Sequence, residues 1–108
     1  SMKKEAINFN IEVKDVFGEV VKDHNKKPLK LNQEVVNILN HPHSIPEGKP
    51  LDIDGILLRL SIQKKAASDK PQVYTTPELT AIQTAVTTLV NNKGTGIGLA
   101  GLILEMTN

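Results

Sequence analysis

The stretch from Tyr74 to Val90 constrains the fold most, because a capped helix start runs there directly into a helical apolar stripe. Thr75 and Glu78 have the spacing of a capping box; the alternative start has Thr76 as the cap and Pro77 as the first helical residue. One face of the following helix is apolar. Its residues are Leu79, Ile82, Val86, Leu89 and Val90. The pattern predicts a helix to about Asn91 that packs on a core.

The length of 108 residues, in which we recognise no internal repeat, predicts a single domain. Aromatic residues make up only 3%, so the core must be built from Leu, Ile, Val and Ala. A small aliphatic core gains from an oligomeric interface, and we therefore expect a homo-oligomer.

The chain contains no cysteine, which excludes disulfides, thiolate zinc sites and a cysteine nucleophile. No apolar run approaches bilayer length and no signal-peptide pattern opens the chain, so we expect a cytoplasmic protein without a membrane contact. Ser1 before Met2 is interpreted as the remnant of a cleaved tag. The net charge of +1 argues against a nucleic-acid partner, and the lysines near Lys26 and Lys64 are interpreted as solvated.

Residues 6–31 predict a β-hairpin region. Ala6 to Val13 alternates, with its apolar side facing helices, and Asp15 to Gly18 has the Asp-x-x-Gly form of a tight turn. The apolar side consists of Ile7, Phe9, Ile11 and Val13. Glu19 to Lys22 would return as a second strand, and Pro28 to Leu31 would add a short third one.

Residues 32–108 predict a helical region of about four helices, which makes the fold class α+β. Asn32 is the expected N-cap of a helix that stops before Pro42. The next helix, from about Leu51 to Ala67, is apolar around more than one stripe, so we expect it to be central or at a subunit interface. A last helix runs from Ile97 to Met106, and its glycines predict close packing on a neighbour.

A glycine-rich loop before the last helix is the best chemical candidate, because backbone N–H groups at a helix start suit an anion. It consists of Lys93, Gly94, Thr95, Gly96, Ile97 and Gly98. With Lys93 as counter-charge it could hold a nucleotide-like ligand. The alternative is a helix C-cap at Gly94 followed by a tight turn, since the loop follows a helix and matches no phosphate-binding motif in order.

Other candidate sites have simpler explanations. His41 and His43 lack the spacing of a metal site, and Asp52 and Asp54 suit a helix start, so we predict no catalytic residue, no metal and no cofactor. An interface is predicted on the apolar helix and on the uncharged polar face of the next one. Its residues are Leu58, Ile62, Thr80, Thr84 and Thr87.

The order of elements from Ile7 to Leu39 resembles a group of small accessory proteins of tailed phages and prophages. The resemblance rests on Val13 to Glu19 and on Pro28 to Asn32, with a weaker match at Thr76 to Leu79. The chain departs from the group in its last helix, which carries a run of glycines. The group has no established catalytic residues, so the resemblance implies no site.

The resemblance and the missing catalytic constellation favour a non-enzymatic phage-type protein that binds and blocks a host protein or ligand in the host cytoplasm. One alternative is an oligomeric sponge that sequesters a nucleotide-derived signal at the glycine-rich loop. Another is a virion or tail assembly chaperone that holds a structural protein on its apolar helix. An enzyme remains a further class, because missing motifs do not exclude activity.

Overall fold

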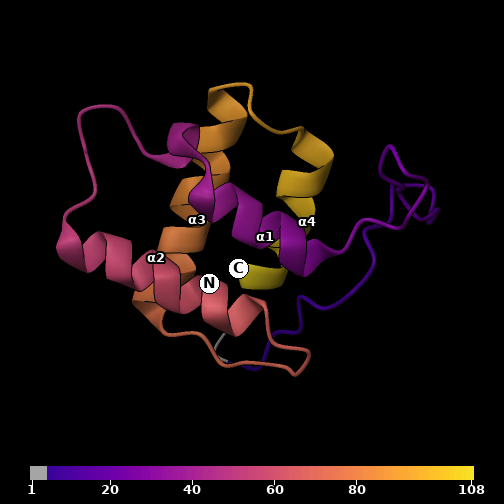
Figure 1. The fold of residues 1–108 in the computed structure, drawn as a ribbon, viewed down its shortest axis with the longest axis horizontal. Coiled ribbons are helices and arrows are strands. Elements are labelled where there is room, and N and C mark those ends of the chain that lie inside the picture. Colours follow the sequence, from indigo (N-terminus) through magenta and orange to yellow (C-terminus); the bar gives the residue numbers. More distant parts are fainter. Residues whose placement is uncertain (1–4) are drawn as a thin grey trace.

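The computed structural model describes residues 5–108, so the interpretation of Ser1 lies outside the described residues. The chain forms helices α1 (Leu31–Asn40), α2 (Ile53–Ala66), α3 (Thr76–Asn91) and α4 (Ile97–Thr107), with a short 3₁₀ helix, η1 (Pro42–Ser44), after α1. No helix in this part of the chain could cross a membrane. Residues 5–30 form an irregular N-terminal arm (Figure 1).

Helix α3 is the centre of the fold. It contacts α1, α2, α4 and η1, and Figure 1 shows α1 crossing in front of it with α4 to one side. Four residues of its predicted stripe, Leu79, Ile82, Val86 and Leu89, are buried as expected, whereas Val90 is only partly buried. Helix α2 packs on α1 and α3 but is not the centre of the fold, and the alternative predicted for it, a subunit interface, stays a prediction.

The start of α3 confirms the capping box. The Glu78 N–H donates to Thr75 Oγ1 (3.3 Å), and the Thr75 N–H donates to Glu78 Oε1 (2.8 Å). Thr75 is thus the N-cap, and the alternative cap at Thr76 does not form. The expected cap at Asn32 is wrong as well, because the N-cap of α1 is Lys30, two residues earlier, and the helix begins at Leu31. Leu31 is fully buried, so its packing sets where the helix begins.

The predicted β-hairpin is wrong: the structure has no β-strand within residues 5–108. The Asp15 turn does form, with Gly18 at a positive φ of 82°. On either side of it, however, the backbone pairs only at single positions, such as Lys14 with Val20. A ladder therefore never extends beyond one bridge.

A closed ring of hydrogen bonds replaces the hairpin. The Val13 N–H donates to the Leu29 carbonyl, the Leu29 N–H to the Val21 carbonyl, and the Val21 N–H to the Val13 carbonyl, each at 2.9 Å. Each of the three segments thus bonds to both others, as the sides of a triangle do, and two segments cannot run alongside each other as a sheet. Val13 is buried in the core, with Val21 and Leu29 packed against it.

The hydrogen-bonded ring was not predicted, although a repeat at a spacing of eight residues indicates it in the sequence. Val13-Lys14-Asp15 recurs as Val21-Lys22-Asp23. Asp23 Oδ1 accepts hydrogen bonds from the N–H groups of Asn25 and Lys27, as Asp15 Oδ1 does from those of Phe17 and Glu19. Lys26 even repeats the positive φ of Gly18. The expectation of a chain without an internal repeat is therefore wrong.

Two further expectations are wrong, one in the arm and one in the last helix. Ile11 is 41% exposed, although Ile7, Phe9 and Val13 are buried as predicted. In α4, a Cβ added at Gly98 or Gly101 would meet no heavy atom within 4 Å, so these glycines are not closely packed on a neighbour.

Candidate functional site

The most exposed large apolar side chains lie at the tip of the first turn in the arm. Val16 is 91% and Phe17 is 87% exposed. The turn beneath them is fixed, because Asp15 Oδ1 accepts from the Phe17 N–H (2.9 Å) and from the Glu19 N–H (3.0 Å). A rigid turn thus presents an aromatic ring to solvent, which costs free energy unless a partner covers it.

An apolar groove of about 690 Å³ adjoins this tip, and we call it the turn–α4 groove. One wall is the hydrogen-bonded ring of the arm and the other is α4. Its apolar lining residues are Val13, Val16, Val21, Leu29, Ile97, Leu99 and Leu102. Gly98 and Gly101 of α4 line this wall without side chains, and a Cβ added at either would meet no heavy atom within 4 Å, so a partner could approach the helix backbone closely.

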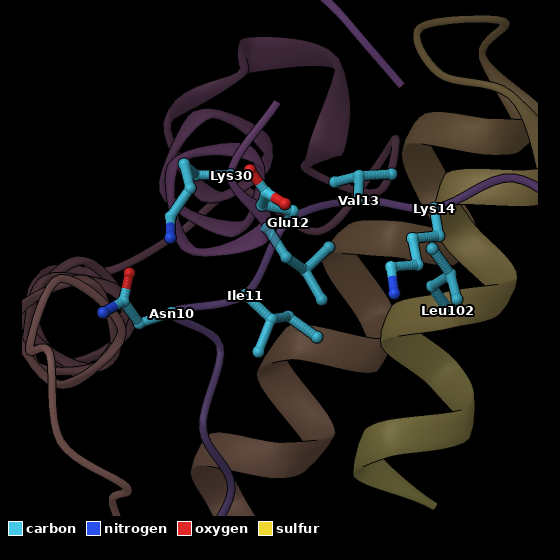
Figure 2. Close-up of a pocket in the computed structure, with 8 residues that line it drawn as sticks. Asn10, Ile11, Glu12, Val13, Lys14, Lys30 and Leu102 are labelled. Carbon is cyan, nitrogen blue, oxygen red and sulfur yellow. The ribbon is translucent and has the colours of Figure 1, made fainter. Parts of the chain in front are cut away.

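A second cleft of about 590 Å³ continues along the arm and shares Val13, Lys14 and Leu102 with the groove. Figure 2 shows Ile11 in its middle, with Lys30 and Asn10 toward one end and Lys14 and Leu102 toward the other. The arm therefore offers a continuous apolar surface whose edge carries both lysines (Lys14, Lys30) and carboxylates (Glu12, Asp15).

Helix α2 carries a separate exposed apolar face, the α2 stripe. It consists of Ile53, Ile56, Leu57 and Leu60, whose exposed fractions run from 44% to 76%. These positions follow the spacing of one helix face, so they form a contiguous surface. The sequence predicts too much apolar surface on this helix for one buried stripe, and the structure places the excess on the solvent side.

The structure separates the predicted interface residues. Leu58, Thr80 and Thr84 line one cleft of about 500 Å³ between α2 and α3. Thr87 lies next to Thr84 on α3, and its hydroxyl donates to the Gln83 carbonyl (2.9 Å) and to the Thr84 carbonyl (3.3 Å), but Thr87 does not line this cleft. Ile62 is fully buried in the core, so it cannot contact a partner in this fold.

The glycine-rich loop forms a Schellman motif at the end of α3. The Gly94 N–H donates to the Leu89 carbonyl (2.8 Å) and the Lys93 N–H to the Val90 carbonyl (3.0 Å), with Lys93 itself at a φ of 61°. This is the C-cap alternative, although the left-handed residue is Lys93 instead of Gly94. The backbone of Thr95 and Gly96 then leads into α4. Anion binding by Lys93 to Gly98 stays a prediction.

Two buried charged groups were not predicted from the sequence, and the first is an ion pair. Lys65 Nζ lies 2.6 Å from Glu78 Oε1 and 3.0 Å from the Val73 carbonyl. It also lies 5.5 Å from the centre of the Tyr74 ring. Burial raises the pKa of Glu78, but hydrogen bonds from Lys65 and Thr75 outweigh it and leave this pKa below its ordinary value. The pair stabilises the fold and does not mark a reactive carboxylate.

The second group is Arg59, a charge inside the otherwise apolar segment Leu57 to Leu60. It is 5% exposed. Its guanidinium donates to Ser44 Oγ (2.7 Å), to the Ser44 carbonyl (3.1 Å) and to the Leu39 carbonyl (3.4 Å). Burial lowers its pKa from the ordinary value. The position of this arginine between leucines is the sequence feature from which a buried charge could have been predicted.

The remaining titratable groups within residues 5–108 form no recognisable chemical site. The His41 and His43 rings lie 5.3 Å apart, and no group of three or more metal-ligating side chains occurs among residues 5–108. The Tyr74 hydroxyl is buried without a hydrogen-bond partner, and burial followed by the nearby Glu78 charge raises its pKa.

Comparison with protein-family models, with curated proteins and with solved structures found no match for this chain. The candidate site therefore rests on geometry alone, and that geometry defines a small helical protein with two exposed apolar surfaces.

Proposed function

We propose that this protein is a non-enzymatic, phage-type accessory protein that binds and blocks a host protein through the Phe17 turn and the turn–α4 groove. The observation that carries the proposal is the exposed Phe17 ring on a turn fixed by Asp15. Aromatic anchors supply much of the energy of protein interfaces. A preformed turn also loses little conformational entropy on binding.

The arrangement of the surface supports a protein partner. Phe17 can insert into a pocket of the partner, while the groove beside it receives an apolar segment in return. Charges of both signs border the two hollows, with Lys14 and Lys30 beside Glu12, Asp15 and Glu105, so a matching partner would carry both signs around its apolar contact. Reciprocal insertion of this kind buries apolar area on both sides and excludes water from the centre.

Photo-crosslinking tests this function. A benzophenone amino acid at position 17 is expected to capture one bacterial protein, whereas the same group at position 25, the equivalent site in the second turn, captures none. With the purified partner, Phe17→Ala should weaken binding by about 30-fold or more, since a hot-spot side chain contributes at least about 2 kcal/mol. Asn25→Ala should change the affinity for the partner less than twofold. Equal crosslinking at both positions, or full affinity of Phe17→Ala, would refute the proposal.

The α2 stripe supports the proposed homo-oligomer. Asp54 lies at the start of this helix and Lys64 in its last turn. Two antiparallel copies of α2 would therefore bring opposite charges together at both ends of the apolar contact. The same stripe favours the second candidate function, an assembly chaperone that holds a structural protein, and a stripe covered by self-association would leave no room for that client.

A further inference from the structure

The cleft of about 500 Å³ between α2 and α3 has an unusual balance of charge. Its walls include the apolar side chains of Leu51, Leu58 and Pro77, together with two cations, Lys49 and Arg59. No carboxylate of the described residues lines it. The volume is within the usual range for small-molecule sites, about 300–1,000 Å³.

The charge of Arg59 has no counter-ion in the described part of the chain. The one ion pair within residues 5–108 joins Lys65 to Glu78, and the three acceptors of Arg59 are neutral oxygens of Leu39 and Ser44. A buried charge without an opposite charge is costly, even when it is hydrogen-bonded. An anion that enters the cleft would therefore be bound more strongly here than at an exposed lysine.

The hydrogen bonds of Arg59 also leave donors for that anion. Two of the bonds use Nη1 and one uses Nη2. A guanidinium has five N–H groups, so the Nε–H and one Nη2–H have no acceptor among residues 5–108. These nitrogens are neighbours on one edge of the guanidinium, and a pair of adjacent donors suits the two oxygens of a carboxylate.

We propose that this cleft binds a small organic carboxylate with an apolar body. The carboxylate lies on the remaining donors of Arg59, Lys49 adds a second positive charge, and the apolar body packs against Leu51, Leu58 and Pro77. The site is distinct from the turn–α4 groove. The proposal therefore stands or fails independently of the proposed function.

Octanoate is a suitable probe, and octanamide is its neutral match. Titration of the full chain with octanoate, followed by amide NMR, is expected to shift the signals of Lys49, Leu58 and Thr84 in a saturable way. Octanamide should bind at least tenfold more weakly, because it lacks the charge. Equal binding of the two compounds, or shifts confined to other regions, would overturn the proposal.

Substitutions separate binding from stability. Arg59→Met removes the bonds to Ser44 and can unfold the chain, so the exposed Lys49 carries the test. Lys49→Ala should weaken octanoate binding at least fivefold without a change in the unfolding midpoint. Lys64 is the control, because it is an exposed cation on α2 that does not line the cleft. Lys64→Ala should change the affinity for octanoate less than twofold. Equal effects of the two variants, or displacement of octanoate by inorganic phosphate at equal concentration, would refute a site for an apolar carboxylate.

Discussion

Lys65 Nζ lies 2.6 Å from Glu78 Oε1, and this contact joins the last turn of α2 to the capping box of α3. Glu78 therefore has two structural tasks. Its oxygen Oε1 accepts from the N-cap backbone of Thr75 and also from Lys65, while Oε2 lies 3.3 Å from the Ser61 hydroxyl. One carboxylate thus fixes both where α3 begins and how α2 lies against it.

Glu78→Gln should lower the free energy of unfolding at pH 7 by about 1–3 kcal/mol, because the partly buried hydrogen bonds from Lys65 and Thr75 lose a charged acceptor. The pKa of Glu78 is lowered by folding, so its stabilisation is present above the unfolded-state pKa of about 4.3 and is lost as the pH falls through the folded-state pKa. Urea unfolding at pH 7 and pH 3 checks this. The difference in the free energy of unfolding between Glu78→Gln and wild type should be smaller at pH 3 than at pH 7. The control Glu47→Gln, at an exposed position, should differ little from wild type at either pH. A similar loss of stability in Glu47→Gln would contradict the structural role of Glu78.

Gly94→Ala should destabilise the protein by about 1–3 kcal/mol, as overpacking does. A Cβ at this position would overlap the side chain of Leu89, which is buried and cannot move freely. Gly98→Ala is the matched control, because its Cβ would meet open space inside helix α4. That variant should be more stable than wild type by up to about 1 kcal/mol. Thermal unfolding of the two variants measures the contrast, and two equal shifts would count against the Schellman geometry.

The two phenylalanines should respond in opposite ways to truncation. Phe9 is 2% exposed and its ring lies 5.6 Å from that of Tyr74, so Phe9→Ala should cost about 3–5 kcal/mol. Phe17→Ala should change stability by less than about 0.5 kcal/mol, because the ring is exposed. Urea unfolding of both variants gives the comparison. A large loss in Phe17→Ala would mean that the ring packs within its own chain.

Leu57→Lys tests self-association through the α2 stripe. The wild-type protein should exceed the mass of one 11.8 kDa chain in light scattering at micromolar concentration, and the variant should return to that mass. Its unfolding midpoint at low concentration should stay close to that of wild type, because Leu57 is 56% exposed. Glu47→Lys, a charge change outside the stripe, should leave the mass unchanged. A monomeric wild-type protein would refute the proposed homo-oligomer.

Local chemistry by itself determined the ends of several elements. The capping box at Thr75, the stop of α1 before Pro42 and the turn at Asp15 are visible in the sequence because each depends on residues within four positions of one another. The Schellman motif at Lys93 was one of two alternatives for the same reason. The repeat of Val13-Lys14-Asp15 is equally visible in the sequence, although the predicted hairpin took no account of it.

Only the tertiary structure decided how the elements meet. Alternating residues from Ala6 to Val13 are equally compatible with a strand and with one side of a hydrogen-bonded ring, because the pattern specifies which side chains are buried and not which backbone groups pair. The sequence of α2 has more apolar residues than one buried face needs and does not indicate which of them are buried. Packing placed Ile62 inside and Leu57 outside. The contacts of Arg59 with Ser44 and of Lys65 with Glu78 join residues 15 and 13 positions apart, a distance over which no local pattern selects a partner.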